Sequence, residues 1–187
     1  MVSLNTKKPE PTFTHTLKEV VSREGSTLES LSKDAPTLVV FLQHLGCVYC
    51  RESLSELRRL RSEIEANGVR IALVHMGSES EASNLLEVFN LTDLPRFSDP
   101  ERRLYEAFGL ERSTMSRMLA PENLISMLKS VVRSEVPLRR TMGKVVGDAL
   151  QMPGVFLIHE NLILDDYRPE NLTKRPDYLK LAALDCN

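Results

Sequence analysis

The sequence has few cysteines and no long apolar segment. Three cysteines in 187 residues are few and odd in number, which excludes the disulfide framework of a small secreted domain. The longest apolar runs span about five residues, whereas a helix that crosses a bilayer needs roughly 20. The first ten residues contain no apolar core, so we expect no secretory signal and a cytoplasmic protein.

An excess of one sign of charge is also absent. The chain has 24 basic and 26 acidic residues and a net charge of -2, so its charge balance does not indicate nucleic acid or an anionic membrane as a partner. Neither internal repeats nor low-complexity segments are present. The length and a charged fraction of 27% therefore indicate one compact soluble domain.

Two of the cysteines, Cys47 and Cys50, lie between an apolar run and a long amphipathic segment. The run at residues 38–42 is typical of a strand covered on both faces. Apolar residues then recur at steps of three and four up to Ile64, as in a helix that Asn67 and Gly68 terminate. This order predicts a strand, a short turn and a helix whose first turn carries both thiols. Because a helix N-terminus stabilises negative charge, the pair points to thiolate chemistry on disulfides or peroxides.

The other segments alternate between patterns typical of strands and of helices. We expect further strands at residues 69–75, 155–159 and 162–167, a short extended segment at 94–98, and further helices at 28–33, 78–89, 100–108, 121–132 and 177–184. Ser26 or Thr27 is expected to cap the first of these helices, and Asp99 the one that starts at Pro100. The alternation implies a parallel core with helices on both faces, to which the final hairpin adds antiparallel strands.

Four stretches in order carry a family resemblance, namely residues 41–52, 97–110 and 147–156 and the closing hairpin with its helix. The chain resembles the thioredoxin-fold superfamily and, within it, peroxiredoxin-like proteins of the alkyl hydroperoxide reductase/thiol-specific antioxidant (AhpC/TSA) group, including the selenoprotein-L-related branch. The resemblance implies an α/β fold with a central mixed β-sheet flanked by helices. We expect an N-terminal arm at residues 1–16, a thioredoxin-like domain at 17–187, and within it a helical or looped insertion at about 110–150.

The sequence departs from the family at two places. Peroxiredoxins carry the pattern Pro-x-x-x-Thr-x-x-Cys before the peroxide-reacting cysteine, and here Val40 and His44 occupy the positions of the proline and the threonine. Thioredoxins carry a buried acid six residues before the first cysteine, and here that position is Phe41. The hydroxyl that helps to hold a peroxide is therefore missing.

Several residues are candidates for roles at the thiol site. We expect Cys47 to attack, with its pKa lowered by the helix N-terminus and by Arg51, and Cys50 to resolve. His44 either lowers the thiol pKa and relays a proton or is a histidine that ends the strand. Pro153 resembles the cis-proline that faces the cysteine pair in this fold, which would present the backbone of Met152 to a substrate or partner; the alternative is an ordinary strand-entry proline.

The expected activity is thiol-disulfide or peroxide reduction, which needs no cofactor. Its partners would be a peroxide or disulfide substrate and a thioredoxin- or glutaredoxin-like reductant.

A redox-sensing module without turnover, with residues 110–150 as the responsive surface, is an alternative. A metal site is another, in which His44 and His75 complete a set with the cysteine pair. Cys186 is expected to be a bystander thiol, and Arg96 either solvated surface or an anion contact.

Overall fold

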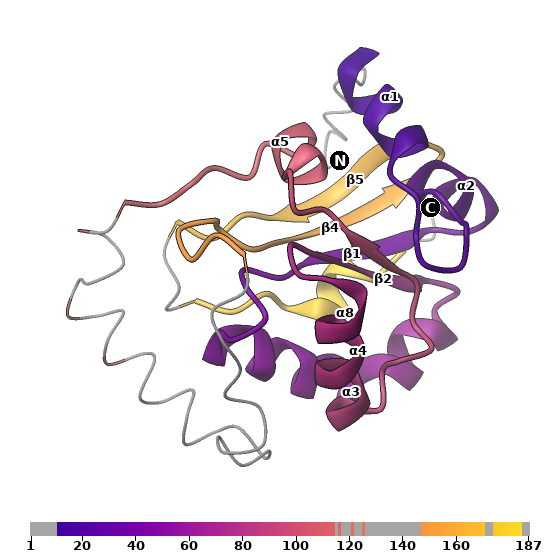
Figure 1. The fold of residues 1–187 in the computed structure, drawn as a ribbon. Helices are drawn as coiled ribbons and strands as arrows, with labels where there is room; N and C mark the ends of the chain where they lie inside the picture. Colours follow the sequence, from indigo (N-terminus) through magenta and orange to yellow (C-terminus); the bar gives the residue numbers. More distant parts are fainter. Residues whose placement is uncertain are drawn as a thin grey trace.

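A computed structural model of the chain describes residues 11–114, 147–170 and 174–184, together with Ser116, Pro121 and Ile125. Its centre is a five-stranded mixed sheet in the order β3-β2-β1-β4-β5 (Figure 1). The strands are β1 (Thr37–Phe41), β2 (Arg70–His75), β3 (Arg96–Ser98), β4 (Gly154–His159) and β5 (Leu162–Tyr167). β1, β2 and β3 are parallel, and β4 and β5 run antiparallel to their neighbours.

Helices cover both faces of this sheet (Figure 1). One face carries α3 (Val48–Ala66), α4 (Glu79–Phe89) and α8 (Tyr178–Leu181); the other carries α1 (Pro11–Glu19), α2 (Leu28–Asp34) and α5 (Arg103–Ala107). All five residues of β1 are buried because alternate side chains enter the two cores: Leu38 and Val40 face α3, and Val39 and Phe41 face α5. The predicted α/β architecture and the interior position of this strand are confirmed.

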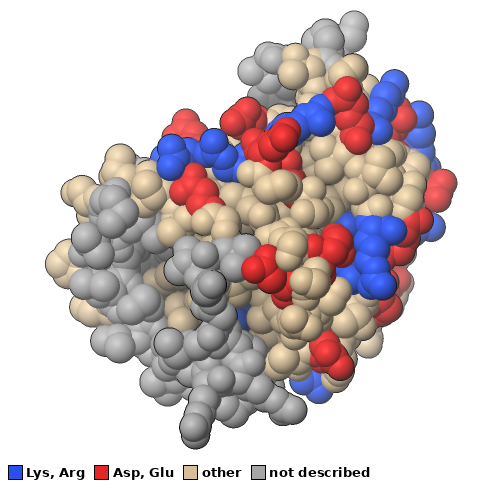
Figure 2. All heavy atoms as spheres, in the orientation of Figure 1, with Lys and Arg blue, Asp and Glu red and all other residues tan. Residues whose placement is uncertain are grey.

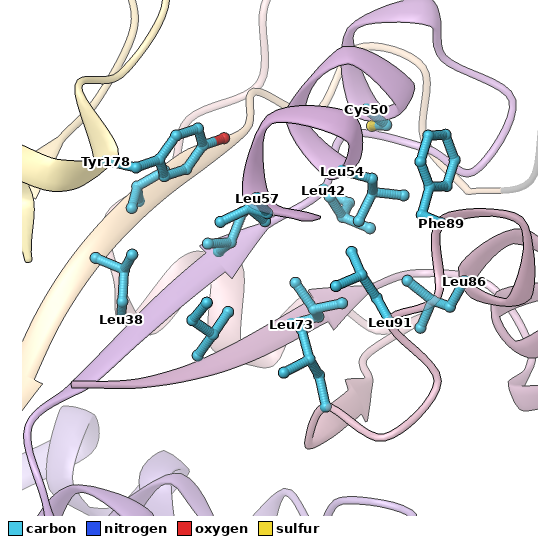
Figure 3. Packing of buried hydrophobic residues seen from close by; sticks show 14 of the residues in the cluster. Leu38, Leu42, Cys50, Leu54, Leu57, Leu73, Leu86, Phe89, Leu91 and Tyr178 are labelled. Carbon is cyan, nitrogen blue, oxygen red and sulfur yellow. The ribbon is translucent and has the colours of Figure 1, made fainter. Parts of the chain in front are cut away.

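The two cores differ in composition. Leucines dominate the α3 side, where Cys50 lies close to Leu42 and Leu54 (Figure 3). On the opposite side the ring of Phe41 packs against Phe108 and Phe156, at centroid separations of 4.8 and 5.5 Å. Such tilted and edge-on contacts add to the burial energy of the rings. The end of β1, just before the cysteine pair, is thus anchored in a packed core on both faces.

Local sequence signals explain most element boundaries. Thr27 and Ser78 cap α2 and α4 with capping boxes, and the helix after the cysteines ends at Asn67 before Gly68, which has a φ of 75°. These starts and stops agree with the sequence-based expectations. The helix expected at residues 121–132 lies outside the described residues.

Two expectations about helix starts were wrong. The chain is helical from Pro11, inside the expected extended arm, because Phe13 and Leu17 bury an apolar face that the short pattern did not reveal. α5 begins at Arg103 rather than at Pro100. Asp99 still acts as a cap, since its carboxylate accepts backbone N–H bonds from residues 103–105, but Arg102 adopts a left-handed φ of 61° and delays the helix.

Two further features of the described residues bear on partners. On the face shown in Figure 2, basic and acidic side chains are interspersed, as the balanced charge suggests. No helix within residues 11–114, 147–170 or 174–184 combines the length and the apolarity that a membrane span requires.

Candidate active site

Cys47 and Cys50 lie where β1 leads into α3. Cys47 is the N-cap residue of the helix, with an extended backbone (φ -77°, ψ 134°), and its side chain does not cap the helix. Cys50 lies in the first helical turn. Both thiols are free and buried, with exposed fractions of 6% and 3%. The predicted strand–turn–helix placement of the pair is therefore confirmed.

Gln43, two residues after the end of β1, contacts both sulfurs. Its backbone N–H donates to Sγ of Cys50 over 3.1 Å, and its side-chain Oε1 accepts from Sγ of Cys47 over 3.0 Å. The Nε2 of the same amide donates to the carbonyl of Ala149 over 2.7 Å. Sequence reasoning missed Gln43, although a polar residue directly after an apolar strand and four positions before Cys47 was the available signal.

The surroundings of the two sulfurs separate their acidities. A hydrogen bond from the Cys50 thiol lowers the pKa of Cys47 well below its usual range against the effect of burial, and the hydrogen bond and positive charge of His44 lower it further. Burial raises the pKa of Cys50 well above its usual range, as do its hydrogen bond to Cys47 and the charge of that sulfur. One sulfur is thus favoured as a thiolate, and the other retains its proton.

His44 and Arg51 differ in their effect on the pKa of Cys47. His44 is half-buried and acts on Cys47 as described. Arg51 is buried, and desolvation lowers its own pKa. It is not among the main groups that lower the pKa of Cys47, which are Cys50 and His44. The acidifying role of Arg51 stays a prediction.

The expectation of a cis bond at Pro153 was wrong, because the peptide bond that precedes it is trans. The trans form is favoured by about 0.5–1 kcal/mol unless a tight turn demands the cis form, and here the chain enters β4 in an extended conformation. The backbone N–H of Met152 donates to the carbonyl of Glu111 over 3.1 Å. That group is therefore already bonded within the protein and is not presented to a substrate.

A pocket lies beside the site, between the first turn of α3, the hairpin β4–β5 and the segment before α8. It is small and partly open to solvent, and Tyr49, Pro153, Tyr167 and Tyr178 are among its lining residues. The guanidinium of Arg175 lies 4.7 Å from the ring centroid of Tyr49 and donates to Glu52 over 2.6 Å. The ring of Tyr49 thus forms one wall of an apolar pocket, and the Arg175–Glu52 ion pair lies beside it.

The proposed four-ligand metal set is not assembled. His75 is buried, its Nδ1 is 3.0 Å from the carbonyl of Gly77, and its Nε2 faces Glu79 at 3.7 Å. Within the part of the chain that the structure describes, no group of three or more His, Cys, Asp or Glu side chains could hold a metal ion. Cys186 lies outside that part.

Solved structures of known proteins share the fold of this chain. Peroxidoxin BcpB of Mycobacterium tuberculosis superposes with a TM-score of 0.58 over 87% of this chain and 86% of that one, at 16% identity. A cysteine-to-serine mutant of peroxiredoxin 6 from Arenicola marina superposes with a TM-score of 0.61 over 89% of this chain and 67% of that one, at 12% identity. The chain therefore has a thioredoxin-like fold of the peroxiredoxin type, with a cysteine pair at the start of α3.

The sequence comparisons then give the family. Residues 56–168 match the AhpC/TSA antioxidant enzyme family, so the chain belongs to it. Prostamide/prostaglandin F synthase of Salmo salar is 28% identical over 149 residues, which cover 80% of this chain and 72% of the relative. The chloroplastic thioredoxin-like protein AAED1 of Arabidopsis thaliana is 29% identical over 103 residues, 55% of this chain and 41% of the relative. The family match starts after Cys50, so it rests on the scaffold rather than on the thiols.

Proposed function

We propose that the protein is a thiol oxidoreductase that reduces peroxides or disulfides through Cys47 and Cys50. The observation that carries the proposal is the opposite direction of the two pKa shifts in one pair of neighbouring thiols. A low pKa supplies the thiolate that attacks, and a high pKa keeps a proton on the second sulfur until it is needed.

With a peroxide, the thiolate of Cys47 attacks one oxygen and the O–O bond breaks. The sulfur becomes a sulfenic acid, and the other oxygen leaves as an alcohol or water after it takes up a proton. The Cys50 thiol then condenses with the sulfenic acid, which releases water and forms the Cys47–Cys50 disulfide. His44, which lowers the pKa of Cys47, is the candidate to supply the proton to the leaving oxygen.

With a disulfide, the same thiolate forms a mixed disulfide and expels one thiol of the substrate. Cys50 then attacks the mixed bond and releases the second thiol, so both routes end in the same intramolecular bridge. A dithiol reductant of the thioredoxin or glutaredoxin type would reduce the bridge and start the next cycle. This chemistry fits a reducing compartment such as the cytoplasm.

The pocket beside Tyr49 bears on the choice of substrate. Its aromatic walls suit an apolar molecule. The relatives named prostamide/prostaglandin F synthase make a prostaglandin a substrate to test. Assignment to the selenoprotein-L-related branch is part of the same proposal.

Turnover measurements test the proposal. Hydrogen peroxide, an organic hydroperoxide, a prostaglandin substrate and a small disulfide are each offered with and without a thioredoxin system. We expect catalytic consumption of at least one substrate, no consumption with Cys47→Ser, and arrest after one event with Cys50→Ser. Cys186→Ser is the matched control and should keep full activity. Turnover that survives Cys47→Ser would refute the proposal.

A redox sensor is the second candidate, because the attacking sulfur is almost fully buried and is tied to Ala149 through Gln43. A sensor would be oxidised once per molecule and would not consume further substrate when the reductant is present. The same measurements therefore separate the two functions: a stoichiometric bridge without turnover favours the sensor.

A further inference from the structure

The side-chain amide of Gln43 has a defined orientation. A backbone carbonyl only accepts hydrogen bonds, so the amide atom 2.7 Å from the oxygen of Ala149 must be the Nε2 donor. The other end of the amide, Oε1, consequently faces Sγ of Cys47 at 3.0 Å. Gln43 is fully buried, so water does not compete for either bond.

This orientation favours the protonated form of Cys47. The thiol can donate its proton to Oε1, but a thiolate only accepts hydrogen bonds and would face the oxygen as a second acceptor. A thiolate would be stabilised by the Nε2 donor instead, and that donor is held by Ala149. Because the two ends of the amide face different partners, the Ala149 carbonyl and a Cys47 thiolate compete for the NH2 end of the amide.

Ala149 belongs to a turn whose position depends on charged groups. The carboxylate of Asp148 accepts from the side chains of Arg112 and Arg102, at 2.5 and 3.3 Å, and from the backbone N–H of Leu150 at 3.0 Å. The Gln151 N–H closes the turn on the carbonyl of Asp148 at 3.1 Å. These bonds hold the Ala149 carbonyl against Gln43, 106 residues away in the sequence.

We propose that Gln43 couples the proton of Cys47 to this turn, residues 148–151. While the turn is in place, the amide presents its oxygen and opposes the acidifying effect of Cys50 and His44 on the attacking sulfur. When a substrate or partner displaces the turn, the amide rotates, Nε2 donates to the sulfur, and the proton of the thiol leaves to solvent. The inference rests on the proposed function only in taking Cys47 as the attacking thiol.

The pH dependence of alkylation at Cys47 tests the first half. All variants carry Cys186→Ser, and iodoacetamide adducts on Cys47 are identified by peptide mass. The midpoint of the alkylation rate plotted against pH reports the ionisation of the thiol. It does not depend on how accessible the sulfur is. Gln43→Met keeps the length and removes the acceptor. We expect the midpoint to fall. At a pH below both midpoints, the variant should hold about three- to tenfold more Cys47 thiolate than the parent protein, as expected when a hydrogen bond to the thiol is lost. An unchanged or higher midpoint would overturn the proposal.

Gln43→Glu keeps an acceptor at the sulfur and removes the donor that thiolate formation needs. Its midpoint should rise by an amount that corresponds to about tenfold less thiolate or more. This variant also serves if the methionine substitution prevents folding. A midpoint that falls in Gln43→Glu would contradict the proposal as directly as a midpoint that rises in Gln43→Met.

A double-mutant cycle with Asp148→Ala tests the link to the turn. Loosening the turn should lower the midpoint when Gln43 is present, because the Ala149 carbonyl then holds Nε2 less firmly. The same change in the Gln43→Met background should have a much smaller effect, namely that of the lost Asp148 charge alone. Equal effects in both backgrounds would show that the turn acts without Gln43 and would refute the coupling.

Alkylation separates this inference from the proposed function. A protein without turnover on any substrate would refute the oxidoreductase, yet its Cys47 profile would still show whether Gln43 and the turn control the proton. Conversely, full turnover with an unchanged profile in Gln43→Met would leave the oxidoreductase intact and refute the coupling.

Discussion

The hydroxyl of Tyr105 in α5 donates to the backbone carbonyl of Leu42 over 2.5 Å. Leu42 immediately precedes Gln43, and its own N–H donates to the carbonyl of Val74 over 2.9 Å. Tyr105 is fully buried, and the hydroxyl also reaches the carbonyl of Val74 at 3.3 Å. A side chain from the opposite face of the sheet thus fixes the backbone that leads from β1 into the thiol site.

Tyr105→Phe should destabilise the protein by about 1–3 kcal/mol, because it leaves the buried carbonyl of Leu42 without its donor. Urea unfolding under reducing conditions measures the effect. The substitution removes one oxygen and leaves the ring, so the packing against Phe41 at 5.1 Å is retained. The change therefore reports on the hydrogen bond rather than on a cavity.

Tyr167→Phe is the matched control. The hydroxyl of Tyr167 is buried and has no hydrogen-bond partner within the residues that the structure describes. Its removal should change the unfolding free energy by less than about 0.5 kcal/mol or increase it, since an unsatisfied buried hydroxyl is costly. Equal losses in the two variants would contradict the structural role assigned to Tyr105.

The second prediction concerns the pH dependence of Cys47. Because its pKa is lowered, alkylation at this sulfur should reach half of its maximum below about pH 8.5, the usual value for cysteine, and should fall as the pH drops through that midpoint. The alkylation rate of Cys47 is measured in a Cys186→Ser protein by the mass of the modified peptide. A midpoint at or above the usual value would remove the physical basis for nucleophilic attack by Cys47.

The third prediction assigns part of that lowering to His44. His44→Gln removes the positive charge and should raise the midpoint by about one pH unit, the size expected for a neighbouring charge. His159→Gln is the control, because His159 bonds the carbonyl of Ser32 at 2.9 Å, outside the thiol site. If the two substitutions shift the profile equally, His44 does not act specifically on Cys47.

The fourth prediction follows from linkage between ionisation and folding. Cys47 loses its proton at a lower pH when folded than when unfolded, so the unfolded chain binds more protons there and stability rises with pH toward about 8.5. Cys50 retains its proton when folded, so stability falls as the pH rises above that value. The reduced protein should therefore be most stable near the unperturbed cysteine pKa.

Denaturant titrations at a series of pH values check this profile. Cys47→Ser should lack the rising part, and Cys50→Ser should lack the falling part, each with a slope change of up to about 1.4 kcal/mol per pH unit. Parallel curves for the three proteins would show that neither thiol has a shifted pKa in the folded state.

Much of the scaffold could be predicted from local patterns. The capped starts of α2 and α4, the strand before the cysteines and the Gly68 stop depend on residues within a few positions of one another. The sequence-based predictions failed where contacts between residues far apart in the sequence determine the environment of a side chain. Arg96 is fully buried rather than solvated, because the side chains of Glu79 and Ser83 and the carbonyl of Thr92 satisfy its guanidinium. No periodicity in the sequence indicates such a set of partners.

The sequence by itself determined that two thiols would stand at the start of a helix behind a buried strand, because helix caps and apolar spacing are local properties. Only the tertiary structure decided what surrounds them. The contact of Gln43 with Ala149, the trans bond before Pro153 and the hydrogen bond from Tyr105 to Leu42 each depend on segments that are brought together by folding. Hydrogen bonding and burial act through space, so the acidity of Cys47 depends on neighbours that its place in the sequence does not specify.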